Sequence, residues 1–80
     1  MNLDIENNIE ARVLLLGIYK RTEDEVLIDV VKAMANNGVF SLKQGKKYLK
    51  DLHGLKLIID GSLSMIGVQK AKEIEIEFKI

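Results

Sequence analysis

The chain contains no cysteine, no proline and no tryptophan among its 80 residues. Without cysteine, a disulfide framework and a thiolate metal site are excluded, so the fold does not depend on the redox state of its compartment. Without proline there is no proline-marked linker, and a chain of this length buries only roughly 60–65% of the surface that it exposes when unfolded. We therefore expect a single domain over residues 1–80 with one modest core, and a cytoplasmic location.

Long hydrophobic runs are also missing. The longest run, VLLLGIY at residues 13–19, is far shorter than the ~18–20 residues that cross a bilayer, and acidic rather than basic residues precede it. It therefore predicts neither a signal peptide nor a membrane anchor. Apolar residues make up 48% of the chain and charged residues 30%, which is typical of a globular domain.

Apolar residues recur at helical spacing over residues 5–19, which predicts a first helix there. The main stripe consists of Ile5, Ile9, Val13 and Leu16. Further apolar side chains widen this surface, namely Leu15, Ile18 and Tyr19. Because the apolar surface is wider than one stripe, we expect this helix to contact more than one neighbour.

A second helix is predicted by Thr22 and Glu25, which have the spacing of a capping box. The helix is expected to begin near Glu23 and to end at Asn37-Gly38, where glycine can adopt the left-handed C-terminal conformation. Its inward side chains are expected to be Val26, Leu27, Val30, Val31 and Met34.

A third helix is predicted by Ser41 and Gln44, which repeat the capping-box spacing. It is expected to end at His53-Gly54. A helical projection places one set of residues together on an inward face: Leu42, Gly45, Leu49 and Leu52.

The pattern changes after residue 54. The run LKLIID at residues 55–60 is aliphatic and β-branched, and Asp60-Gly61 suits a type I′ turn, so a hairpin is expected over about residues 55–64. The last segment is ambiguous, because EIEIEFKI alternates like a strand, whereas other apolar residues of the segment fall at helical spacing. We favour a C-terminal helix from near Ser64 and keep the strand as the alternative for residues 73–80.

Positive charge gathers in the third predicted helix although the formal net charge of the chain is zero. Residues 1–40 contain four Lys/Arg and seven Asp/Glu, residues 41–56 contain five and one, and residues 57–80 contain three and four, which gives −3, +4 and −1. Four lysines share an arc of roughly 100° on the outside of this helix; they are Lys43, Lys46, Lys47 and Lys50. Such a face is expected where phosphates are neutralised, but lysines on a helix exterior can also simply be solvated.

The order of three helices and a hairpin, with the cationic helix third, resembles the winged helix-turn-helix superfamily. The stretch SLKQGKKYLKDLHGLKLI is similar to that family's recognition helix running into its first wing strand. The stretch DGSLSMIGVQKAKEIE is similar to its passage from wing to final helix, through Leu63, Ser64, Gly67, Ala71 and Ile74. The resemblance covers about residues 22–75. It implies a mainly α fold with a small β-hairpin, a short wing and a C-terminal helix, and it implies that the third helix enters the DNA major groove.

The expected wing departs from the family pattern. Its tip, DGS at residues 60–62, contains neither arginine nor lysine, which leaves Lys56 as the only nearby cation on this prediction. The connection NNGVF between the second and third helices also differs from the tight turn of phage repressors. DNA binding is therefore expected to depend on the third helix and on the avidity of a dimer.

Catalytic chemistry has little support in the sequence. His53 is the only histidine, and beside a helix C-terminus it is expected to stabilise the helix dipole. Three serines are predicted to be helix caps or turn residues, namely Ser41, Ser62 and Ser64. The acidic residues 23–25 are expected in the first turn of the second helix, where negative charge is favourable. We expect no enzyme activity, no catalytic residue, no metal site and no cofactor.

Two hypotheses remain. In the first, the chain is a small DNA-binding protein, a transcriptional regulator of phage or mobile-element type, that binds double-stranded DNA. Lysines contact phosphates while Gln44 and Ser41 address base edges, and the residues involved are Ser41, Lys43, Gln44, Lys46, Lys47, Lys50 and Lys56. In the second, the chain is a winged-helix-like module, an inhibitor or assembly factor, that binds a protein partner and no DNA.

A homodimer is expected in addition. The first helix and the C-terminal segment carry more apolar residues than a small core obviously covers, and exposed apolar patches mark association. The residues assigned to this interface are Leu15, Ile18, Tyr19, Ile76, Phe78 and Ile80.

Overall fold

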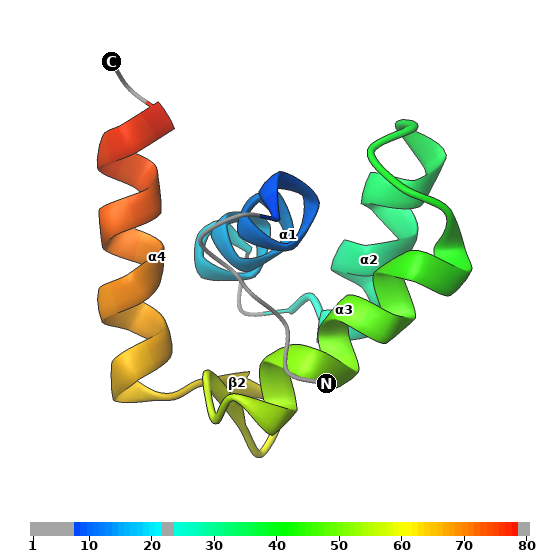
Figure 1. The fold of residues 1–80 in the computed structure, drawn as a ribbon. Helices are drawn as coiled ribbons and strands as arrows, with labels where there is room; N and C mark the ends of the chain where they lie inside the picture. Colours follow the sequence, from blue (N-terminus) through cyan, green and yellow to red (C-terminus); the bar gives the residue numbers. More distant parts are fainter. Residues whose placement is uncertain (1–7, 22–23, 79–80) are drawn as a thin grey trace.

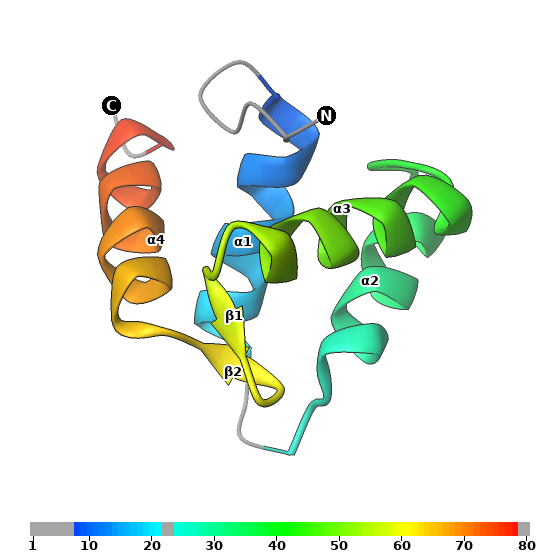
Figure 2. The ribbon, with the colours of Figure 1, turned by 60° about the horizontal axis from the view of Figure 1, so that its bottom comes forward.

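The computed structural model describes residues 8–21 and 24–78, and within them it contains four helices and one two-stranded hairpin (Figure 1). Their order is α1 (Ile9–Lys20), α2 (Leu27–Asn36), α3 (Leu42–Gly54), β1 (Ile58–Ile59), β2 (Ser62–Leu63) and α4 (Met65–Phe78). The prediction of a mainly α fold with a small β-hairpin is confirmed. α4 and α2 lie on opposite sides of α1, and α3 crosses in front of α1 in the second view (Figures 1 and 2).

Helix α1 begins where Asn8 caps it: the Asn8 side chain accepts a hydrogen bond from the amide of Ala11 at 3.0 Å. The buried residues of the helix are Ala11, Leu14, Leu15 and Ile18. The predicted stripe was wrong, since Ile9 is 63% exposed, Val13 and Leu16 are only half-buried, and Ile5 lies outside the described residues. The reason is that α1 is the central helix, in contact with α2, α3 and α4, so its core face is set by neighbours on several sides.

Helix α2 begins later than predicted, at Leu27 rather than near Glu23, which is itself outside the described residues. Val26 takes extended backbone angles at the N-cap, its side chain makes no capping bond, and it is 56% exposed rather than buried. The chain before Val26 has another role, because the backbone carbonyl of Glu25 accepts a hydrogen bond from Arg21 Nε at 3.1 Å. Asp24 and Glu25 therefore precede the helix instead of forming its first turn. The predicted end is confirmed, since Gly38 has a φ of +79° directly after the helix.

The capping box predicted for α3 is confirmed. Ser41 Oγ accepts from the amide of Gln44 at 3.1 Å, and Gln44 Oε1 accepts from the amide of Ser41 at 3.2 Å. Of the expected inward face, Gly45 and Leu52 are buried. Leu49 is half-buried, and Leu42, in the first turn, is 40% exposed.

Glycine at position 45 lets α2 and α3 approach closely. A Cβ atom there would lie 2.5 Å from Phe40 Cε1 and 2.7 Å from Val31 Cγ1. Because real Cβ atoms do not approach other heavy atoms this closely, a larger residue would push α3 away from α2. The small residue therefore sets how deeply α3 packs, and with it the orientation of the opposite face.

The hairpin after α3 has the predicted turn. Ile58 pairs with Leu63 and Ile59 with Ser62 in antiparallel register. Asp60 and Gly61 connect the strands with φ angles of 52° and 79°, the positive values that a type I′ turn requires.

The C-terminal segment is helical to Phe78, so the strand alternative for residues 73–78 was wrong. Ser64 caps α4: its Oγ accepts from the amide of Gly67 at 3.1 Å and donates to the carbonyl of Lys56 at 2.7 Å. Glycine is required at 67, because a Cβ atom would lie 2.1 Å from the carbonyl oxygen of Leu57. These contacts attach the start of α4 to the end of the α3–β1 connection.

Two of the residues assigned to a dimer interface belong to the core of the protomer. Leu15 and Ile18 are fully buried against side chains from the other elements, so that assignment was wrong for both. Tyr19 is half-buried against the same core. Ile76 and Phe78 remain 63% and 41% exposed, and Ile80 lies outside the described residues.

Candidate nucleic-acid interface

The outer face of α3 carries the four lysines that the sequence placed together. Lys43, Lys46, Lys47 and Lys50 are all exposed, while the opposite face of the helix buries Gly45 and Leu52. Among the described residues, none of the four amines makes an ion pair; the salt bridges found there involve Arg12, Lys20 and Lys70. We call these four residues the lysine face. The face is a concentration of positive charge that no described carboxylate neutralises.

The size of α3 is compatible with the major groove of a duplex. An α-helix with its side chains is roughly 10–12 Å across, and the major groove of B-DNA is roughly 12 Å wide. α1, α2 and β1 contact α3, and Figure 2 shows α3 in front of them, with its free side toward the viewer. No described element covers that side in either view. The surface can therefore receive a ligand without rearrangement of the helices.

The polar residues at the start of α3 make hydrogen bonds within the protein. The capping box uses both the hydroxyl of Ser41 and the amide oxygen of Gln44. Gln44 Nε2 makes no hydrogen bond to the described residues and both side chains are exposed. Gln44 therefore presents a free donor, while its amide oxygen, which accepts from the Ser41 amide, has one lone pair left for a second donor.

Tyr48 fixes α3 against α1. Its hydroxyl donates a hydrogen bond to Glu10 Oε1 at 2.6 Å, and its ring meets Phe40 edge to face, with the centroids 5.8 Å apart. The hydrogen bond to Glu10, followed by burial, raises the pKa of Tyr48 above its ordinary value of 10.0, because both favour the neutral phenol. The contact holds the rotation of α3 about its own axis, and so the direction in which the lysine face points.

The wing carries more than the predicted cation. Lys56 is exposed in the turn after α3, where it adopts a positive φ of 63°. The prediction that Lys56 is the only cation close to the wing was wrong, because Arg21 Nη2 donates to the carbonyl of Gly61 at 3.4 Å. Arg21 also donates through Nη1 to the carbonyl of Ile18 and through Nε to that of Glu25, both at 3.1 Å. Its guanidinium is thus directed at backbone carbonyls, and the wing tip itself presents the carboxylate of Asp60.

The remaining candidates have structural roles. His53 lies in the last turn of α3 and its side chain is exposed. The predicted roles of the serines are confirmed: Ser41 and Ser64 cap helices, and Ser62 Oγ donates to the carbonyl of Ile59 across the hairpin turn at 3.5 Å. Within residues 8–21 and 24–78 there is no cluster of three or more residues that could hold a metal ion and no enclosed pocket.

Two contacts that connect α1 and its C-terminal end to later elements have no local signal in the sequence. Glu10 and Tyr48 lie 38 residues apart in the chain, and Arg21 and Gly61 lie 40 apart. Each pairing depends on how α1 packs against the later elements, which no local spacing encodes.

Comparison with known proteins found no matching family model, no matching curated protein and no matching solved structure. None of the described helices combines the length and the apolar character needed to pass through a bilayer.

Proposed function

We propose that this protein binds double-stranded DNA through the lysine face of α3, in the manner of a small cytoplasmic regulator of transcription. The observation that carries the proposal is the lysine face itself: four exposed amines on one side of one helix, without an ion pair to any described residue. Clustered lysines in a neutral chain are the electrostatic footprint expected of a phosphate-binding surface.

The arrangement of α2 and α3 supports this use. The two helices pack closely at Gly45 and are joined by the short connection 37–41, and the hairpin follows α3 directly (Figure 2). This order and packing agree with the resemblance to winged helix-turn-helix proteins. In that mode α3 lies in the major groove, its lysines contact the phosphates on both sides, and Gln44 Nε2 donates to an acceptor on a base edge.

The wing contributes less in this proposal. Its tip carries Asp60, and Arg21 is held by three carbonyls. Among the described cations near the wing, this leaves Lys56 to contact a phosphate. The interface is therefore mainly electrostatic and centred on one helix, which predicts modest affinity per protomer and strong dependence on salt.

The experiment that tests the proposal is a titration of fluorescent duplex DNA at several salt concentrations. If four lysines contact phosphates, log affinity falls linearly with log salt with a slope of about −3 to −4 per protomer, since each contact contributes about −0.9. Absence of binding to any duplex at about 50 mM salt, where non-specific attraction is strong, would overturn the proposal.

A protein-binding module is the second candidate. It is favoured by the exposed apolar side chains outside α3, of which Val26 on the approach to α2 and Ile59 in the hairpin are 56% and 51% exposed. A failed DNA titration would make this candidate the leading one, with the lysine face then available to an acidic partner.

A further inference from the structure

The lysine face consists of two pairs that point in different directions. Successive residues of an α-helix lie about 100° apart around its axis. The buried and half-buried residues of α3 define its inward side, and they are Gly45, Tyr48, Leu49, Asp51 and Leu52. Lys43 and Lys50 lie within about 15° of the direction opposite to the mean of these residues, and we call them the central pair. Lys46 and Lys47 lie about 50° from that direction, one on each side, and we call them the flanking pair.

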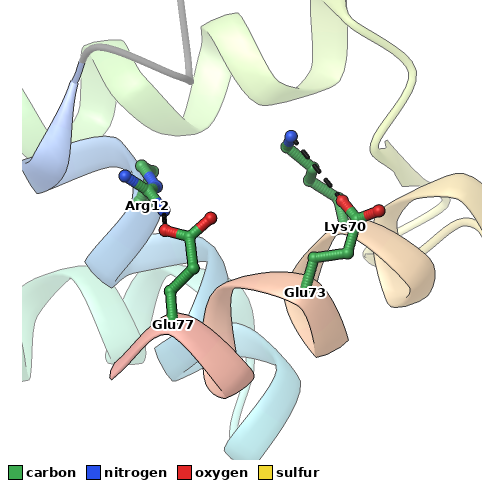
Figure 3. Close-up of polar contacts among 4 residues, drawn as sticks. All are labelled: Arg12, Lys70, Glu73 and Glu77. Atoms are coloured by element: carbon green, nitrogen blue, oxygen red, sulfur yellow. Dashed lines mark ion pairs between the residues drawn. The ribbon is translucent and has the colours of Figure 1, made fainter. Parts of the chain in front are cut away.

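The amines of the central pair have no carboxylate partner among the described residues, unlike basic side chains elsewhere in the fold. Arg12 on α1 pairs with Glu77 on α4 (Figure 3). Within α4, Lys70 pairs with Glu73 (Figure 3). In α3, all of which the structure describes, Asp51 is the only acidic residue; it is half-buried and lies roughly 90° round the helix from the central pair. The donors of the central pair are therefore available to a ligand.

The two pairs meet different parts of a duplex when α3 lies in the major groove. The helix nearly fills the width of the groove, so its outermost side chains face the floor, where the base edges lie. Side chains about 50° to either side face the walls of the groove, which are the backbones of the two strands. The flanking pair is thus directed at phosphates and the central pair at bases. Because both pairs neutralise phosphate charge, base preference rather than salt dependence distinguishes them.

We propose that Lys43 and Lys50 read guanine on the floor of the major groove, an inference that rests on the proposed binding to duplex DNA. A lysine amine donates hydrogen bonds and has no acceptor, and guanine presents only acceptors in the major groove, N7 and O6. Adenine and cytosine each present an amino donor there, and thymine presents a methyl group beside its acceptor. Gln44 lies further round the helix, beyond Lys47, so its proposed contact is separate from this one.

Altered bases test the contact without a change in the protein. Three duplexes of one length contain cytosine paired throughout with guanine, with 7-deazaguanine, in which a C–H group replaces N7, or with inosine. Inosine keeps N7 and O6 and lacks only the amino group in the minor groove, so it is the matched control. At about 50 mM salt, the wild type should bind the guanine and inosine duplexes alike. It should bind the 7-deazaguanine duplex at least about fivefold more weakly, since a good contact to a base contributes that much or more. Equal or tighter binding of the 7-deazaguanine duplex would overturn the proposal.

Paired substitutions separate the two pairs of lysines. Methionine keeps the length of the side chain and removes its charge, so Lys43→Met with Lys50→Met and Lys46→Met with Lys47→Met change the net charge equally at exposed positions. The central variant should bind the three duplexes with the same affinity. The flanking variant should bind each of them more weakly than the wild type but keep the wild-type preference. Preference that survives in the central variant, or that both variants lose equally, rejects the contact to guanine.

The same titrations distinguish this inference from the proposed function. A wild type that binds all three duplexes equally refutes the reading of guanine and leaves DNA binding intact. A wild type that binds no duplex of any sequence at this salt concentration refutes the proposed function and the reading of guanine with it. Circular dichroism of the variants, which should match the wild type, shows that a loss of preference does not come from a loss of helix.

Discussion

The hydroxyl of Tyr48 on α3 lies 2.6 Å from Oε1 of Glu10 on α1 and donates a hydrogen bond to it. This is a direct polar link between the central helix and the helix that carries the lysine face. It is half-buried rather than fully exposed, so its loss is expected to affect both the stability of the domain and the packing of α3.

Tyr48→Phe should lower the free energy of unfolding by about 1–2 kcal/mol at neutral pH, because it removes a hydrogen bond to a carboxylate while keeping the ring. The pKa of Tyr48 is raised in the folded state. The stabilisation that the hydrogen bond from Tyr48 to Glu10 contributes is therefore fully present below pH 10, and it is lost as the pH rises through the folded-state pKa of Tyr48. Urea denaturation between pH 7 and 11 should show the difference between wild type and variant narrowing above pH 10. Tyr19→Phe is the control, since Tyr19 makes no side-chain hydrogen bond to the described residues; an equal loss there would contradict a specific role for Tyr48.

Gly45→Ala should destabilise the domain by about 1–3 kcal/mol, since the added methyl group would overlap Phe40 and Val31. This loss exceeds the gain of about 1 kcal/mol in helix propensity. Gly54→Ala is the matched change within the same helix, because nothing lies within 4 Å of a Cβ atom there, and it should be neutral or stabilising by about 0.5–1 kcal/mol. Thermal and urea denaturation of both variants measure the difference; equal stabilities would show that α2 and α3 tolerate a wider separation.

Lys46→Glu combined with Lys47→Glu should abolish binding to duplex DNA. Both side chains are exposed and point away from the core, so stability should change by only ~0.5 kcal/mol. The single variants Lys47→Glu and Lys32→Glu form a matched pair with the same change in charge, and Lys32 is exposed on α2 outside the lysine face. Equal weakening by the two single variants in a fluorescence titration would mean that net charge alone governs binding.

Gln44→Ala should cost ~1–3 kcal/mol of binding to a preferred site and little on random DNA, if Gln44 reads a base edge. Ser41→Ala separates this effect from the capping box, because it removes the other cap bond and should lower stability by ~1 kcal/mol without relaxing sequence preference. The comparison requires a preferred site selected from a random library with the wild-type protein. Identical selectivity of wild type and Gln44→Ala would remove the base contact and leave phosphate contacts only.

Local signals were sufficient for much of the fold. The capping box at Ser41, the left-handed glycine at 38 and the Asp60-Gly61 turn each follow from interactions within a few residues, and all three are confirmed. The start of α2 was mispredicted because Arg21 donates to the carbonyl of Glu25, and the same guanidinium also donates to the carbonyl of Gly61, 40 residues later in the chain. The face of α1 was misassigned for a similar reason: a central helix with several neighbours has no single stripe.

The candidate site, like the fold, could be predicted from the sequence only in part. The exposure of the lysine face could be predicted, because the helical period separates it from Gly45 and Leu52. The residues assigned to a dimer interface could not be sorted in this way, since Leu15 and Ile76 look alike in sequence and only the folded structure shows that the first is covered and the second is exposed. The direction in which α3 points depends on Tyr48 and Gly45, whose partners lie on other elements.

The three hydrogen bonds of Arg21 have a consequence for local unfolding. One guanidinium joins the end of α1, the approach to α2 and the turn of the hairpin through the carbonyls of Ile18, Glu25 and Gly61. Opening any one of these segments weakens the support of the other two, so we expect them to exchange their amide hydrogens as one cooperative unit rather than as separate loops. The smallest element of the fold would then gain its protection from a residue forty positions earlier in the chain.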